Sequence, residues 1–253
     1  MPAMRQRNHG RNEELQRQYE SIRNGRNEDR GKFILTYCQR FYQSDGLGGF
    51  GDIGYVPNIE LLEGPFAYLK QDGTIEALGG DSAMVSIPTE TKQNDDEIKV
   101  TLLTPHRAVE MAGKGNSSVL RIFSKAFERY ENVYDLFSRI VDHETAHAVN
   151  YKFGFPYELC TWLPEGSNAS AQDLIDEGNI QDGQKLDFYL TLQDLLAYRM
   201  QLASGNFPDK ISDKERRHIL KDYKRNFERL SKFPESSLRK DLTAVLDPKK
   251  LKR

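Results

Sequence analysis

The sequence predicts an α+β fold, with a mixed β-sheet in its N-terminal half and helices in its C-terminal half. Two changes of pattern lead to this prediction. Residues 55–105 contain short runs, among them FAYLKQ, AMVSIPT and EIKVTLLTP, bounded by the Gly, Pro and Asn-Asp signals that end strands. After residue 115, apolar residues recur at helical spacing instead. A chain of 253 residues, 38% of them hydrophobic, is long enough to bury a sizeable core.

The chain divides into three parts, of which the first two precede residue 116. Residues 1–30 are rich in Arg, Asn, Gln and Glu and almost free of aliphatic residues, which predicts a polar mobile arm or a marginal helix. Residues 31–115 form the β-rich part, in which residues 33–41 have no clear period and residues 98–104 alternate as a half-buried strand does.

The glycines of residues 46–54 fit G-x-G-x-x-G. Two prolines and no helical period follow them, which favours a flexible loop or hairpin tip over a nucleotide site.

Residues 116–253 form the helical part. Asn116-Ser117-Ser118 is a suitable cap, and apolar residues from Val119 to Tyr130 then recur at helical spacing. A second periodic set begins at Val133 and ends near Gly154. Ser-Asp-Lys-Glu at residues 212–215 is a capping box, because its Ser and Glu can bond each other's backbone amides. We therefore predict three further helices, at about residues 165–176, 185–204 and 212–232.

The composition excludes several classes of protein. No apolar run approaches the ~20 residues of a membrane span, and the N-terminus lacks an apolar signal core. We expect no membrane partner and a cytoplasmic location by default, with export as an effector as the alternative. Cys38 and Cys160 lie far apart and form no C-x-x-C pair. This excludes a disulfide scaffold and predicts two reduced, buried thiols.

The charge is unevenly distributed. The formal net charge is −2, yet the segment from Asp209 to Arg253 carries 15 Lys and Arg against 8 Asp and Glu. A basic segment on an acidic body can bind an acidic partner or nucleic acid. The preferred interpretation is a solvated helical face that complements the acidic body, so a nucleic-acid partner is not expected.

Residues 141–150, VDHETAHAVN, contain two of the five histidines of the chain. On a helix, residues four apart share a face, so His143 and His147 can offer two imidazoles to one metal ion. Glu144 is displaced around the helix axis, which suits a carboxylate beside the attacking water. Thr145 and Ala146 between the histidines and Ala148 and Val149 after them are uncharged, and an apolar face at residues 140–141 precedes the motif. This pattern favours a metal site over the alternative, a surface helix with two unliganded histidines.

A catalytic zinc ion usually has three protein ligands, and Glu165, in the stretch TWLPEG, is separated from His147 by seventeen intervening residues. His-Glu-x-x-His followed at this distance by Trp-Leu-x-Glu-Gly resembles the gluzincin metallopeptidases, the class of thermolysin-like enzymes and zinc aminopeptidases. The resemblance covers residues 140–170. It implies a zincin-like fold with an active-site helix and one Zn²⁺ ion bound by His143, His147 and Glu165. It also implies Glu144 as general base in the hydrolysis of a peptide or protein substrate by water that the metal activates.

The sequence departs from the gluzincin pattern at two points. Thermolysin-like members have an aspartate four residues after the third ligand, where this chain has Ala169. The candidates to replace it as a partner of a ligating histidine are Asn168, Asp173 and Asn150. The aminopeptidase element Gly-x-Met-Glu-Asn is missing, which favours an endopeptidase. Should Glu165 not be the third ligand, the reserve candidates are Asp173, Glu177 and Asp187.

The oxyanion-stabilising residue and the substrate-binding strand remain open choices. Related enzymes use a downstream Tyr or His, and the candidates are Tyr189, His218, Tyr198 and Tyr157. The strand predicted at residues 98–104 is a candidate edge for binding an extended peptide. The alternative function is a catalytically inactive interaction protein that keeps the zincin scaffold and binds a partner through this edge strand or the basic C-terminal region.

Overall fold

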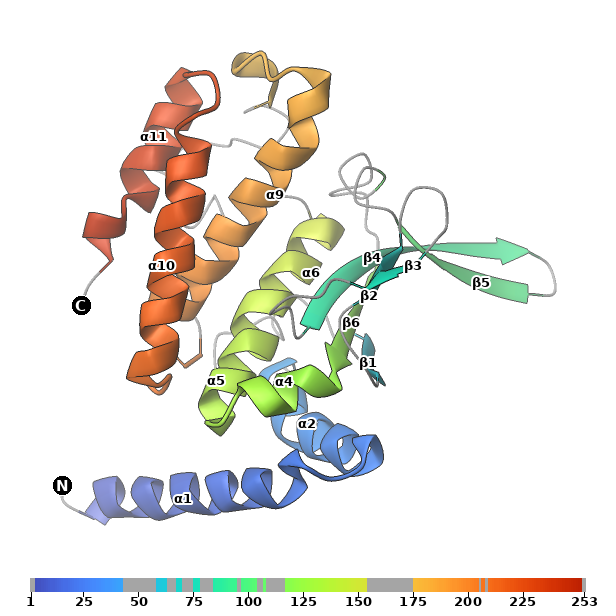
Figure 1. Ribbon diagram of the computed structural model, residues 1–253, viewed down its shortest axis with the longest axis vertical. Helices are drawn as coiled ribbons and strands as arrows, with labels where there is room; N and C mark the ends of the chain where they lie inside the picture. Colours follow the sequence, from blue (N-terminus) through green and yellow to red (C-terminus); the bar gives the residue numbers. More distant parts are fainter. Residues whose placement is uncertain are drawn as a thin grey trace.

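A computed structural model shows an α+β protein, mostly helical, with a small mixed sheet (Figure 1). It describes residues 3–42, 58–62, 67–69, 75–77, 84–94, 97–103, 107, 117–153, 175–204, 206–207 and 209–251. The predicted fold class is thereby confirmed at the level of α+β. Within the described part of the chain, no helix combines the length and the apolar content that crossing a membrane requires.

The main sheet has four strands in the order β1-β6-β4-β5. β4 pairs antiparallel with β5 and with β6, and β6 pairs parallel with β1, so the sheet is mixed as predicted. The four strands are Asn58–Leu62 (β1), Met84–Asn94 (β4), Glu97–Leu102 (β5) and Ser117–Phe123 (β6). A separate two-stranded ribbon pairs β2 with β3, at Ala67–Leu69 and Ile75–Ala77. Strand β5 confirms the strand that was predicted at residues 98–104.

The prediction of a helix from Val119 to Tyr130 is wrong over its first half. Residues 117–123 form β6, a central strand of the sheet, and only Ser124–Arg129 are helical (α4). β6 is buried at all but two of its positions, because β1 and β4 flank it and α6 packs on it. A strand that is buried on both faces reads as a continuous apolar run, which a short helix can also produce. Ser117 and Ser118 therefore begin a strand and do not cap a helix, whereas Asn116 lies outside the described residues.

The N-terminal segment is helical rather than a mobile arm. Ala3–Arg23 form α1 and Asn27–Tyr42 form α2, which includes the stretch of unclear period. Tyr19 of α1 is fully buried, and its hydroxyl donates to the backbone oxygen of Tyr130. The C-terminal half of α1 is thus part of the core. Cys38 on α2 is a buried, reduced cysteine, as predicted, whereas Cys160 and the glycine-rich loop lie outside the described residues.

One long helix runs through the middle of the molecule and carries the His-Glu-x-x-His motif. It consists of Val133–Phe137 (α5), a π-helical segment Ser138–Glu144 (η2) and Thr145–Phe153 (α6), and it confirms the helix predicted from Val133. Asn132 caps its start by accepting a bond from the Tyr134 amide. The helix packs on β4 and β6 with one side and on α9 with the other (Figure 1). The motif therefore lies between the sheet and the C-terminal helices.

The C-terminal helices confirm two of the three further helices predicted. Asp182–Arg199 form α9, which continues into a second π-helical segment, Met200–Ser204 (η3). Asp213–Leu230 form α10, and the Ser212 hydroxyl accepts from the Glu215 amide, as the capping box predicted. The remaining elements are Ser237–Leu246 (α11) and Pro248–Lys250 (η4). Of the helix expected at residues 165–176, the structure describes only the last two residues, which are helical.

Candidate metal centre

His143 and His147 lie on the same face of the central helix, as their spacing predicted. Their ring centroids are 4.9 Å apart and their planes are inclined at 77°. His143 is fully buried and His147 is mostly buried. Both rings point toward α9, which packs against this face. The face that carries the histidines is thus turned inward.

Each histidine is oriented by a glutamine of the neighbouring helix. His143 Nδ1 lies 2.9 Å from Oε1 of Gln201, and His147 Nδ1 lies 2.8 Å from Oε1 of Gln193. An amide oxygen only accepts hydrogen bonds, so each Nδ1 carries a proton, and in the neutral tautomer Nε2 is the nitrogen with the lone pair. Such a contact fixes the tautomer and the ring orientation of a ligating histidine. Of the candidates for this role, Asn168 and Asp173 lie outside the described residues, and the contacts seen to the two Nδ1 atoms come from these glutamines and not from Asn150.

The Nε2 atom of His143 has an unusual environment. It is buried and has no hydrogen-bond partner among the residues that the structure describes. Burial lowers the pKa of His143 well below its usual value, and repulsion by Arg139 and His147 lowers it further. The ring is therefore neutral at pH 7, the form that binds metal ions. A buried nitrogen lone pair without a partner is costly unless something binds there.

Asp194 of α9 completes a group of three possible ligands. One ligand atom from each of His143, His147 and Asp194 lies within 4.8 Å of the other two. His147 Nε2 and Asp194 Oδ1 are 3.7 Å apart. Two imidazole nitrogens and a carboxylate oxygen are a donor set that zinc commonly takes in catalytic sites. A tetrahedral zinc ion with bonds of about 2.0–2.2 Å places its ligand atoms about 3.4 Å apart, so the group must contract when it binds the ion.

The other predicted ligands are not part of this group. Glu165, the third ligand implied by the gluzincin resemblance, lies outside the described residues. Of the three reserve ligands, Asp173 also lies outside the described residues. Glu177 accepts a bond from the Ser237 amide, and Asp187 pairs with Arg229, so these two lie elsewhere on the surface. Asp194 was not predicted. The sequence signal for it is that it is the only charged residue between Asp187 and Arg199 on α9.

Glu144 is held between the central helix and the sheet. Its Oε2 accepts from the Ser86 amide of β4 at 2.9 Å, and its Oε1 lies 2.8 Å from a guanidinium nitrogen of Arg139. The Ser86 hydroxyl donates in turn to the Glu144 backbone oxygen. Arg139 and Glu144 are five residues apart, and the i→i+5 pattern of η2 brings such residues close to one face of the helix. The π-helical segment thus explains why both side chains enter the same cavity.

Asp142 joins η2 to the segment after η3. It accepts hydrogen bonds from the backbone and side-chain nitrogens of Asn206, at 2.7 and 3.0 Å, and from the Phe207 amide at 3.3 Å. Burial raises the pKa of Asp142 to about 6. These bonds lock the segment that follows Gln201 against the helix that carries His143. π-helical segments often occur at functional sites, and here two of them face each other.

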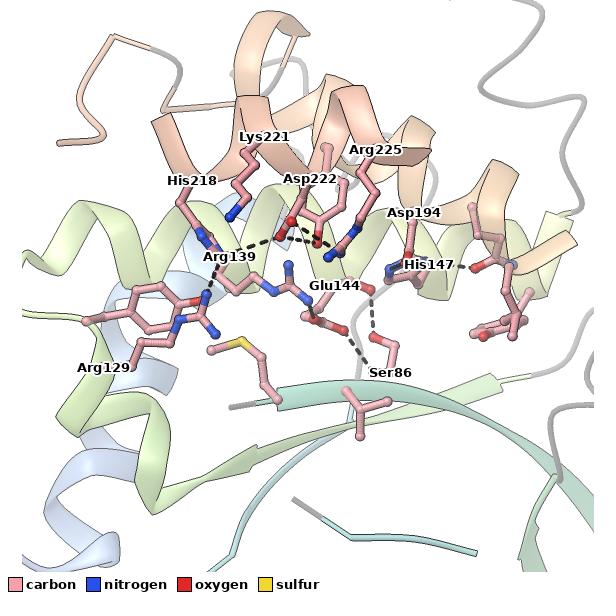
Figure 2. A pocket seen from close by; sticks show the side chains of 17 residues that line it. Ser86, Arg129, Arg139, Glu144, His147, Asp194, His218, Lys221, Asp222 and Arg225 are labelled. Atoms are coloured by element: carbon pink, nitrogen blue, oxygen red, sulfur yellow. Dashed lines mark hydrogen bonds and ion pairs between the residues drawn. The ribbon is translucent and has the colours of Figure 1, made fainter. Parts of the chain in front are cut away.

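A cavity of about 530 Å³ opens between the central helix, β4, α9 and α10 (Figure 2). Glu144, His147 and Asp194 line it, as do Tyr198 and His218, two of the four oxyanion candidates. Tyr198 lies against His143, with ring centroids 4.6 Å apart. Burial raises the pKa of Tyr198 to about 12, which keeps its hydroxyl protonated.

The remaining sequence-based candidates lie away from this cavity or outside the described residues. Tyr189 is buried in the core and is not among the residues that line the cavity. Tyr157 lies outside the described residues. The strand at the cavity wall is β4, through Met84, Val85 and Ser86, and not β5, which is the edge of the sheet.

Comparisons of the chain with protein-family models, curated proteins and solved structures gave no match.

Proposed function

We propose that this protein is a zinc-dependent metallopeptidase of gluzincin-like, zincin type, and that it acts as an endopeptidase. One observation carries the proposal. The imidazoles of His143 and His147 converge with the carboxylate of Asp194, and each Nδ1 contacts a glutamine oxygen, which leaves each Nε2 as the nitrogen for a metal ion. The buried Nε2 of His143, which has no partner among the described residues, is difficult to account for without a ligand.

The ion would supply Lewis-acid activation of water and of the scissile carbonyl. The remaining steps belong to the protein. Glu144 takes a proton from the attacking water and passes it to the leaving amine, as the bond from carbon to oxygen forms and the bond to nitrogen breaks. Its carboxylate has about four lone-pair sites. The Ser86 amide occupies one of them, and Oε1 forms an ion pair but no hydrogen bond with Arg139, which leaves sites for this proton.

The third ligand has two candidates. Asp194 is supported by its distance to the histidines, and Glu165 by the resemblance of TWLPEG to the gluzincin pattern. Zinc content of Asp194→Ala and of Glu165→Ala distinguishes them, because only loss of a true ligand lowers affinity sharply. We assign the role to Asp194.

Tyr198 is the best-supported candidate for stabilising the oxyanion. It lines the cavity, contacts His143 and keeps its hydroxyl proton. A hydroxyl of this kind can donate a hydrogen bond to the charge that develops on the carbonyl oxygen. Strand β4 at Met84–Ser86 is the candidate for aligning an extended peptide, in place of the strand at residues 98–104.

The test is hydrolysis of an unstructured protein such as casein by the zinc-loaded wild type and by Glu144→Gln. We expect cleavage by the wild type and a loss of about a hundredfold or more in the variant, because general-base catalysis contributes about 10²–10⁴-fold. Both proteins should hold the same amount of zinc, since Glu144 is not a ligand. A zinc-loaded wild type that cleaves nothing, or a Glu144→Gln that cleaves normally, contradicts the proposal.

A non-catalytic scaffold is the second candidate, and one observation favours it. The ion pair with Arg139 and the bond from Ser86 give Glu144 a structural role that joins the helix to the sheet. If this role were the only one, the wild type would bind zinc without cleaving peptides. Glu144→Gln would then lower only the free energy of unfolding.

A further inference from the structure

The wall of the cavity opposite the proposed metal ligands is basic. Figure 2 shows Arg129, Arg139 and Lys221 together on one side, with Glu144 between them and the metal ligands. These three cations come from three elements, α4, η2 and α10. Arg225 of α10 is a fourth cation of the same cavity.

The positive charge of this wall is only partly balanced. Arg139 pairs with Glu144 at 2.8 Å, and Arg225 pairs with Asp222 at 3.1 Å. Lys221 is exposed and forms no ion pair with any residue that the structure describes.

The hydrogen bond between Arg129 and His218 does not neutralise the positive charge of Arg129. One of its guanidinium nitrogens lies 2.7 Å from Nε2 of His218. Because an arginine can only donate, Nε2 of His218 accepts this hydrogen bond, and the imidazole ring contributes no negative charge. A divalent cation bound at the far side of the cavity would add to the positive potential.

We propose that this basic wall, formed by Arg129, Arg139 and Lys221, is a subsite for a carboxylate group of the peptide substrate. The inference rests on the proposed peptidase function, since the carboxylate belongs to a peptide bound at that centre. Guanidinium groups bind the planar carboxylate through paired, charge-assisted hydrogen bonds, and a lysine adds a point charge. The group is either the side chain of Asp or Glu or the α-carboxylate of a C-terminal residue.

Lys221 and Lys224 form a matched pair for the test. Both are exposed lysines of α10, but only Lys221 lines the cavity. Lys221→Glu and Lys224→Glu change the net charge of the protein equally. Any general effect of charge on peptide binding therefore appears in both variants, whereas an effect of the subsite appears only in Lys221→Glu.

The probes are short peptides with an acetylated N-terminus and an amidated C-terminus. One position holds Glu, Gln or Lys and all other residues are uncharged. A series of such peptides places this variable residue at each position in turn. A further peptide has Gln at that residue and a free C-terminal carboxylate. Cleavage is measured by mass spectrometry as kcat/KM, and binding is measured separately by fluorescence anisotropy of labelled peptides. All measurements use the zinc-loaded protein.

At one position of the walk, the wild type should prefer Glu over Gln by about tenfold or more, as expected for hydrogen bonds to a charged group. Lys221→Glu should bring this ratio close to one or favour the Lys peptide, and Lys224→Glu should keep the wild-type ratio. A preference for the free C-terminus over every Glu peptide identifies the α-carboxylate as the bound group. Equal cleavage of all the peptides overturns the subsite while leaving the peptidase function intact.

The binding measurement separates the two proposals. If no peptide is cleaved, yet the Glu peptide binds more tightly than the Gln peptide and Lys221→Glu removes the difference, the subsite stands and the peptidase function fails. If no peptide is cleaved and the Glu, Gln and free-carboxylate peptides bind alike, the subsite fails as well.

Discussion

Replacing Gln201 by Leu removes the acceptor that orients His143 while leaving all three proposed ligands in place. The amide oxygen of Gln201 lies 2.9 Å from Nδ1 of His143, and both side chains are fully buried. Leucine fills a similar volume but accepts no hydrogen bond. The Nδ1–H group then has no partner in a site that water does not reach, and the ring loses its fixed orientation.

The expected effect on zinc affinity follows from these contacts. A buried donor without a partner costs about 1–3 kcal/mol. Loss of the group that orients a ligating histidine weakens metal binding by about 10–100-fold, which corresponds to a similar free energy. The dissociation constant for zinc is measured by competition with a chromophoric chelator, and circular dichroism checks that the variant is folded.

Gln193→Leu is the matched control, because it makes the same change beside His147. The His147 side chain is 12% exposed, so water can replace part of the lost hydrogen bond. We expect a smaller loss of zinc affinity, below about tenfold. Wild-type zinc affinity in Gln201→Leu, or a larger loss in Gln193→Leu, would refute the reasoning about the two glutamines.

Three further results are expected. Asp142→Ala should lower the free energy of unfolding in urea by about 3 kcal/mol, because it leaves the buried Phe207 amide and the partly buried donors of Asn206 without this acceptor. A loss below about 1 kcal/mol would contradict the role of Asp142. Tyr198→Phe should lower kcat by about a hundredfold with zinc content unchanged, and an unchanged kcat would remove Tyr198 from the mechanism. Burial raises the pKa of Asp135, although its bonds to Ser212 oppose the shift. The folded protein therefore retains a proton that the unfolded chain releases above about pH 4, and this contribution to stability is lost as the pH rises through the folded-state pKa. Asp135→Asn should flatten that part of the stability profile, and an unaltered profile would contradict the shift.

Local spacing made part of the site predictable from the sequence. His143 and His147 share a face because they are four residues apart on one helix, and Glu144 follows from the same motif. The helix itself follows from the apolar period that begins at Val133, and the start of α10 follows from the capping box at Ser212. These features depend on interactions between residues that are close in the sequence.

The partners of the two histidines could not be predicted in this way. Gln193, Asp194 and Gln201 reach the site only because α9 packs against the central helix, a contact between segments about fifty residues apart. The helical period of α9 indicates a buried face but not its neighbour. The π-helical segments η2 and η3 also have no reliable sequence signal, yet they determine how Arg139 and Glu144 meet.

The misassigned strand β6 has a different cause. Val119 and Ile122 fit a helical period and are also typical of a buried strand, because β-branched residues pack well in sheets. The segment forms a strand and not a helix because β1 and β4 both pair with it in the sheet. A short apolar run alone does not contain that information.

The central claim is that His143, His147 and Asp194 bind one zinc ion, and zinc content per chain after equilibrium dialysis tests it most directly. We expect one zinc ion per chain in the wild type and a loss of most of it in Asp194→Ala. Asp187→Ala is the matched control, because Asp187 is an acidic residue of the same helix that pairs with Arg229 instead. It should retain the full zinc content. A wild type that takes up no zinc, or an Asp194→Ala that holds as much as the wild type, would contradict the account.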